Sequence, residues 1–127
     1  MSAPGEPGGR VVLFRAVGPS ELELIRASGG AGFPRRGHHE PILSVTPSEE
    51  VARREARSWN VEDQRVGYVV RFEVDAGWLA RYPVQDPDGT PEHWIPNEAI
   101  EAFNARIVAP IQVVAVLRPP PATRTRS

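Results

Sequence analysis

The length, composition and charge of this chain restrict what it can be. Its 127 residues suffice for one domain with one core, so we expect a single site. The hydrophobic fraction of 40% and charged fraction of 24% are typical of a globular protein, and the formal charge of −1 gives no bulk attraction to nucleic acid or to an anionic membrane. The absence of cysteine excludes a disulfide framework, a thiolate nucleophile and a Cys-based zinc site.

The two ends of the chain differ in composition from the middle. Residues 1–9 are rich in Gly and Pro and predict a disordered linker, residues 119–127 predict a disordered tail, and the folded domain is expected between 10 and 118. The apolar runs are far shorter than the ~20 residues of a membrane span, and the N-terminal segment lacks the apolar stretch of a secretory signal. We therefore expect a cytoplasmic protein, or one delivered into a target cell without a cleaved signal peptide.

The first part of the domain predicts a strand, a helix and a loop. Residues 11–16 form a β-rich run between glycines, which predicts a central strand. Ser20 is expected to cap a short amphipathic helix that ends at residues 28–30. Residues 29–41, with five Gly or Pro before Pro41, predict a loop, and loops on rigid scaffolds often carry functional residues.

A second strand and helix come next. Residues 42–46 predict a short strand, and Thr46 is expected to cap a helix that starts at Pro47 and continues to about Trp59. Residues 66–74 alternate between an apolar stripe and other residues, which predicts a third strand, and residues 76–79 resemble a single turn.

The last part closes the domain. Residues 86–91 predict a turn-rich loop, Asn97 is expected to cap a final helix, and residues 107–117 predict one broken or two short strands around Pro110. The connections are too short for regular crossovers. The order of elements therefore predicts an α+β fold with a mainly antiparallel split sheet and short helices.

Four polar residues stand out as candidates for a site. Arg15 is the only charged residue of its strand and must be paired, either with a structural carboxylate or with an anion in a cleft. Ser44 and Thr46 lie two apart on one strand, so their hydroxyls are expected on one face, where they can bind a ribose or simply meet solvent and cap a helix. Glu92 lies where a loop becomes a strand, and it either points into a cleft or is an exposed glutamate.

Two other patterns indicate no site of their own. Adjacent side chains diverge and no third ligand is spaced for them, so His38 and His39 do not predict a metal site, and we expect no metal. The run Gly29-Gly30-Ala31-Gly32 follows a helix, whereas the dinucleotide-binding fingerprint follows a strand.

Several short segments follow one another in a characteristic order. They are Leu13-Phe14-Arg15-Ala16 before a helix, Ile42-Leu43-Ser44-Val45-Thr46-Pro47-Ser48 opening a helix, the strand Gly67-Tyr68-Val69-Val70-Arg71-Phe72-Glu73-Val74, Glu92-His93-Trp94-Ile95-Pro96, and Ala102-Phe103-Asn104-Ala105-Arg106-Ile107. This order, over residues 11–117, resembles bacterial ADP-ribosyltransferase toxin domains of the arginine-serine-glutamate type.

The resemblance implies an enzyme that consumes NAD and transfers ADP-ribose to a protein, with an immunity or antitoxin protein as a further partner. By position it implies that Arg15 anchors NAD, that Ser44 and Thr46 shape the nicotinamide-ribose pocket, and that Glu92 drives transfer. Arg35 and Arg36 are expected to help with the pyrophosphate.

The motifs also differ from the family in two places. The middle motif reads Ser-Val-Thr, and Thr90 stands two before Glu92, where many members place Glu or Gln to orient the acceptor. Hydrolysis of NAD, and a non-catalytic module that binds a protein in the same groove, stay open as alternatives.

Overall fold

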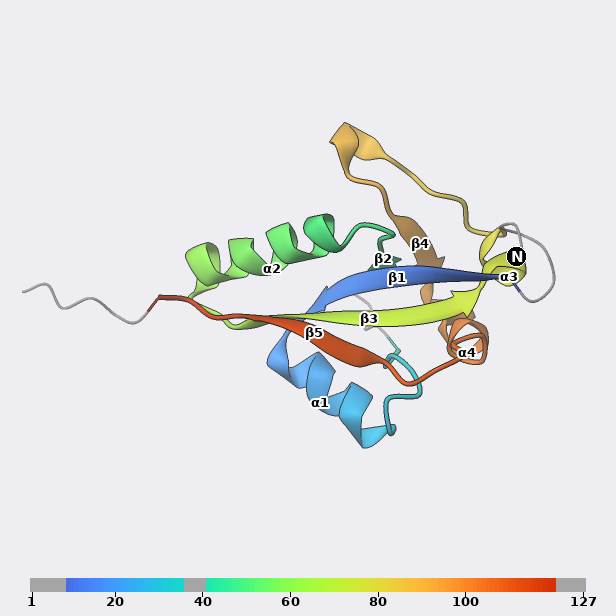
Figure 1. The fold of residues 1–127 in the computed structure, drawn as a ribbon, viewed down its shortest axis with the longest axis horizontal. Helices are drawn as coiled ribbons and strands as arrows, with labels where there is room; N and C mark the ends of the chain where they lie inside the picture. Colours follow the sequence, from blue (N-terminus) through green and yellow to red (C-terminus); the bar gives the residue numbers. More distant parts are fainter. Residues whose placement is uncertain (1–8, 36–40, 121–127) are drawn as a thin grey trace, which may run out of the picture.

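The structure, a computed structural model, describes residues 9–35 and 41–120. The greater part of the predicted linker and tail lies outside these residues, as do Arg36, His38 and His39. In chain order the elements are β1 (Arg10–Val17), α1 (Pro19–Ala27), β2 (Ile42–Val45), α2 (Glu49–Asp63), β3 (Gly67–Asp75), α3 (Ala76–Leu79), the 3₁₀ turn η1 (Pro87–Gly89), β4 (His93–Pro96), the 3₁₀ turn η2 (Asn97–Ala99), α4 (Ile100–Asn104) and β5 (Gln112–Leu117) (Figure 1).

The strands form two antiparallel sheets. One has the order β1-β3-β5, and the other pairs β2 with β4. An isolated bridge joins them, in which the Phe14 amide donates to the Thr46 carbonyl at 2.7 Å and the Thr46 amide donates to the Phe14 carbonyl at 2.9 Å. The α+β class with antiparallel sheets and short helices, expected from the sequence, is confirmed.

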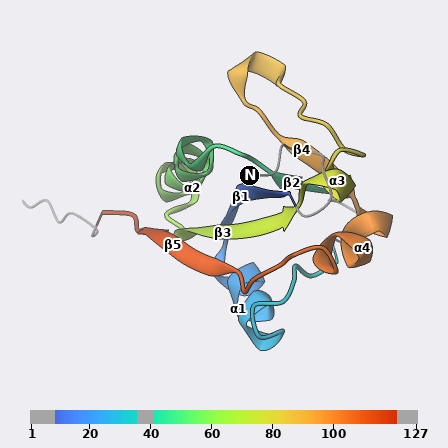
Figure 2. The same ribbon diagram turned by 45° about the vertical axis from the view of Figure 1, so that its right-hand side comes forward.

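The two longer helices cover opposite faces of the three-stranded sheet (Figures 1 and 2). On the α1 face, Leu22 and Ile25 pack into a large core with Phe72 of β3 and with the inward side chains of the small sheet. Val70, Phe72 and Val74 are buried on this face, which confirms the apolar stripe expected in the third strand.

The α2 face is built from small side chains. Ala16, Ala52, Ala56 and Val69 form a separate buried cluster there. A Cβ added at Gly67 would lie 2.7 Å from the Ala56 Cβ and 3.0 Å from its Cα, so the lack of a side chain at Gly67 lets α2 approach β3 at the level of its backbone.

The expected start of the second helix is wrong by two residues. Thr46 is buried by its bridge to β1, and its hydroxyl accepts a hydrogen bond from the Ser48 amide at 3.0 Å, which turns the chain before the helix begins. Ser48 is the actual N-cap, accepting from the Val51 amide at 3.2 Å. The helix then continues beyond Trp59 to Asp63, and its C-cap is Gln64, whose φ is 54°.

Two other expected caps are also wrong. The N-cap of α1 is Gly18 rather than Ser20, because Pro19 occupies the first helical position, where its fixed φ suits a helix and its missing N–H costs nothing. Asn97 is the first residue of the turn η2 that precedes α4, and its amide donates to the Pro41 carbonyl at 2.8 Å. Within the described residues, none of the helices has the length and hydropathy that a membrane crossing needs.

Candidate functional site

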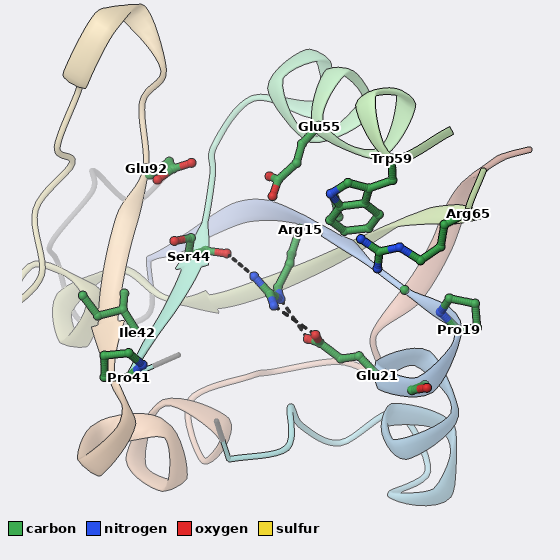
Figure 3. Close-up of a pocket in the computed structure, with 13 residues that line it drawn as sticks. Arg15, Pro19, Glu21, Pro41, Ile42, Ser44, Glu55, Trp59, Arg65 and Glu92 are labelled. Atoms are coloured by element: carbon green, nitrogen blue, oxygen red, sulfur yellow. Dashed lines mark hydrogen bonds and ion pairs between the residues drawn. The ribbon is translucent and has the colours of Figure 1, made fainter. Parts of the chain in front are cut away.

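A cleft opens where the two sheets separate. Beyond the Phe14–Thr46 bridge, β1 and β2 diverge, and a hollow of about 630 Å³ lies between them. Its walls come from the end of β1, the start of α1, β2, the second half of α2 and the segment before β4 (Figure 3). This volume lies within the ~300–1,000 Å³ of typical small-molecule sites.

Arg15 lies at the centre of this cleft. Its Nε and one Nη donate to the two carboxylate oxygens of Glu21 at 2.8 and 2.9 Å, and the other Nη donates to the Ser44 carbonyl at 2.9 Å. The Arg15 and Glu21 side chains are only 11% and 14% exposed, so the pair is largely shielded from solvent. The structural carboxylate partner of Arg15 is therefore present, and the residue also lines a cleft; the binding of an anion there stays a prediction.

Ser44 faces the cleft because of the alternation along β2. Leu43 and Val45 point into the core, so Ile42 and Ser44 point the other way and line the hollow. Thr46 was expected on the same face, but it is absent from the described lining of the cleft, since its side chain is buried at the bridge and its hydroxyl is bonded to the Ser48 amide.

Glu92 is held at the opposite wall by backbone and side-chain contacts. Its amide and carbonyl pair with Gln85 at 2.7 Å each, and its carboxylate accepts a hydrogen bond from the Trp94 indole N–H at 2.7 Å. The residue is half-buried and lines the cleft. The backbone of Glu92 is therefore fixed by its pairing with Gln85, while its side chain faces the cavity. This geometry was expected for a residue at the point where a loop becomes a strand.

The cleft thus brings together Arg15, Ser44 and Glu92, which come from three separate segments of the chain. Arg35 is exposed and is not part of the described lining. Arg36, the other arginine expected to contact pyrophosphate, lies outside the described residues.

Glu55 is a lining residue that sequence reasoning missed. It projects from α2 toward Arg15 (Figure 3). Although the residue keeps solvent access through the open cleft, desolvation of the carboxylate raises its pKa; Arg15 opposes this effect, and Glu92 and Glu21 add to it. Only the position of α2 reveals that this glutamate faces a cavity, because α2 carries charged residues on several sides.

The aromatic residue of the cleft is also not one that the sequence singled out. Phe14 and Tyr68 pack against the core clusters. Trp59 lines the hollow instead, with the Arg65 guanidinium 4.6 Å from its ring centroid.

The described lining of the cleft therefore offers the Arg15–Glu21 ion pair, two serine hydroxyls, the carboxylates of Glu55 and Glu92, and an indole–guanidinium pair. Comparison of the chain with protein-family models, curated proteins and solved structures finds no match. Within residues 9–35 and 41–120 no cluster of three potential metal ligands is found.

Proposed function

We propose that this cleft binds NAD and that the protein transfers ADP-ribose from NAD to a macromolecular acceptor, with a protein as the favoured class, as bacterial toxins of this kind do. The observation that carries the proposal is the convergence of Arg15, Ser44 and Glu92 on one hollow of suitable size for a dinucleotide. The same three residues are the ones that the resemblance to ADP-ribosyltransferase toxins assigns to NAD.

The reaction suits the charges of the cleft. Breaking the bond between nicotinamide and ribose builds positive charge on the sugar, as in other glycosyl transfers. A carboxylate held in place before the reaction stabilises that charge, and such preorganised electrostatics are usually the largest catalytic contribution. The hydrogen bond from Trp94 and the pairing with Gln85 supply this preorganisation for Glu92.

Arg15 is assigned to a phosphate of NAD. A guanidinium has five N–H donors, and the bonds to Glu21 and Ser44 use three of them. Those three bonds fix the plane of the group, so little side-chain entropy is lost when a phosphate oxygen binds to the others. Ser44 is assigned to the nicotinamide ribose, whose hydroxyls its own hydroxyl can meet.

The test is the release of nicotinamide from NAD by the purified protein. We expect the wild-type protein to release it and Glu92→Gln to lower kcat by at least about a hundredfold, because the neutral amide keeps the Trp94 contact and loses the charge. Glu98→Gln serves as the matched control, since Glu98 is exposed and is not among the described lining residues. An inactive wild-type protein, or equal rates for wild type and Glu92→Gln, would overturn the proposal.

A second measurement concerns the fate of ADP-ribose and the anchor. Mass spectrometry of proteins incubated with NAD distinguishes covalent ADP-ribose from free ADP-ribose, and so distinguishes transfer from hydrolysis. Arg15→Lys is expected to raise KM for NAD by about tenfold or more, because an ammonium cannot reproduce the planar fork that Glu21 and Ser44 hold. Calorimetry that gives equal NAD affinity for the variant would remove Arg15 from the anchor role.

A further inference from the structure

A second, smaller hollow adjoins the main cleft. It has a volume of about 320 Å³ and lies between α2 and the segment before β4, with Arg54 and Ser58 on one wall and Thr90 on the other. The two hollows have two lining residues in common, Glu55 and Glu92. These two carboxylates come from opposite walls. A molecule bound in the second hollow would therefore contact a molecule bound in the main cleft at the point between Glu55 and Glu92.

We propose that the second hollow admits the acceptor and that Glu55 is a further catalytic residue, the general base that takes the acceptor's proton as it attacks the ribose of NAD. This inference rests on the proposed function. It adds the hollow through which the acceptor reaches NAD and the residue that takes the acceptor's proton.

The packing of α2 against the sheet holds the Glu55 carboxylate in a defined position, as proton transfer requires. Its neighbour Ala56 is completely buried and lies against Gly67, so a movement of α2 away from the sheet at this point would expose packed surface. Catalytic groups on packed helices are held more precisely than those on loops. Glu92 has a different task, because its carboxylate is hydrogen-bonded to the Trp94 indole.

The surroundings of Glu55 favour its use as a base. Desolvation raises its pKa, the negative charges of Glu92 and Glu21 raise it further, and the positive charge of Arg15 lowers it. Arg54, which precedes Glu55 on α2, is the cation that lines the second hollow among the described residues. A carboxylate with a raised pKa accepts a proton more readily than an ordinary one.

The segment before β4 contributes Thr90 and Glu92 to the described lining of the second hollow. Thr90 offers only a hydroxyl, and the Glu92 carboxylate already accepts the hydrogen bond from Trp94. A hydroxyl cannot hold the proton of an attacking group at neutral pH. Glu55 supplies the carboxylate from the facing helix instead, on the same hollow.

The step balances with NAD and the acceptor alone. The bond between the nicotinamide ring nitrogen and ribose C1′ breaks, and its electron pair stays on the nitrogen, so neutral nicotinamide leaves. The acceptor oxygen or nitrogen forms a bond to C1′, its proton passes to the Glu55 carboxylate, and that proton then passes to water. The products are nicotinamide, the ADP-ribosylated acceptor and one proton.

The experiment uses the full chain with NAD, water as the acceptor, and azide as a nucleophile that carries no proton. Glu55→Ala is expected to release nicotinamide about a hundredfold more slowly than wild type, which is within the range of general base catalysis. Azide is expected to restore most of the rate and to give ADP-ribosyl azide, detected by mass spectrometry, because it needs no base. Glu62→Gln, on the same helix but absent from the described lining of both hollows, is the control and is expected to match wild type.

Two further variants keep the test decisive. Glu55→Gln, close in shape, replaces Glu55→Ala if the latter fails to fold. The wild-type rate is expected to fall at acidic pH as Glu55 is protonated, and Glu55→Gln is expected to lose that fall. Glu92→Ala is expected to be inactive with or without azide, since azide does not replace a stabilising negative charge on the other side of the sugar.

The outcomes separate the two proposals. If the wild-type protein releases no nicotinamide, the proposed function fails and this inference fails with it. If Glu92 variants are inactive while Glu55→Ala and Glu55→Gln keep the wild-type rate and pH profile, only the role of Glu55 is overturned. An inactive, folded Glu55→Ala that azide does not restore also overturns the role of Glu55 as a base.

Discussion

The two faces of the three-stranded sheet are packed with very different side chains. Among residues 9–35 and 41–120, the α1 face carries a cluster of fifteen buried residues that includes Phe33, Phe72 and Phe103, whose ring centroids lie 4.9 to 6.3 Å apart. The α2 face carries four buried residues of the same part of the chain, and three of them are alanines. Apolar area is therefore concentrated on the first face, so most of the hydrophobic stabilisation is expected there.

The α2 face buries little apolar area, but it determines where α2 lies relative to β3. Small residues at Gly67 and Ala56 bring the backbones of β3 and α2 into contact, and the residue next to Ala56 is Glu55 of the cleft. Stability and the geometry of the cleft are therefore expected to depend on different sides of one sheet. Substitutions on the two faces should therefore affect different measurements.

The largest expected effect comes from emptying the α1 face. Phe72→Ala is expected to lower the free energy of unfolding by about 3–5 kcal/mol, because it leaves a cavity between Phe33 and Phe103. Val69→Ala, on the opposite face of the same strand, is expected to cost only about 1.5–2 kcal/mol. Urea unfolding of both variants measures the difference, and equal losses would contradict the division between the faces.

Gly67→Ala is expected to have a smaller effect on stability and a larger one on the cleft. The new Cβ would lie 2.7 Å from the Ala56 Cβ, so we expect a loss of about 1–3 kcal/mol and a displacement of α2 that lowers nicotinamide release. The double variant with Ala56→Gly should regain part of both losses.

Gly29→Ala is the control for Gly67→Ala. Gly29 has φ 75° and open space around its Cβ position, so alanine there should cost about 1 kcal/mol through backbone strain while kcat stays unchanged. A Gly67→Ala variant that loses stability and keeps the wild-type kcat would show that the close approach of α2 does not position the cleft.

The α1 face is also the part of the molecule that could be predicted from sequence. Alternation along residues 66–74 and the spacing of Leu22 and Ile25 identify buried positions, because both patterns depend on local geometry alone. The caps could not be predicted in the same way. Thr46 and Ser48 both have a side chain that can cap a helix, and the bridge of Thr46 to a distant strand decides between them.

The candidate site was predictable only where a residue stands out within its own segment. Arg15 is an isolated charge in an apolar strand, and Glu92 ends a turn-rich loop, so both could be named before the fold was known. Glu55 and Trp59 lie one turn apart on a helix with many charges, and nothing local tells which side of that helix meets the cleft. The contact between Gly67 and Ala56 determines it, and that contact joins residues from two elements.

The smallest expected effect tests whether Glu55 serves the site at a cost to folding. Because desolvation raises its pKa in the folded state, the folded protein binds more protons than the unfolded chain as pH rises above about 4, and the free energy of unfolding falls through that window. Glu55→Gln removes the ionisation, so relative to wild type it should gain stability between pH 3.5 and pH 7. The substitution lies on an exposed part of α2, so the gain is expected to stay below about 0.5 kcal/mol.

Urea unfolding of the wild type and Glu55→Gln at the two pH values measures this gain, and Glu62→Gln reports the effect of removing a charge elsewhere on the same helix. A gain of the opposite sign would mean that Arg15 stabilises the Glu55 carboxylate more than desolvation destabilises it. A more stable Glu55→Gln that no longer releases nicotinamide would show that the charge at this position is unfavourable for folding and required for the reaction. The protein would then keep an ionised Glu55 that lowers the free energy of unfolding because the reaction in the cleft requires it. This loss would fall on the face of the sheet that has little buried apolar area to offset it.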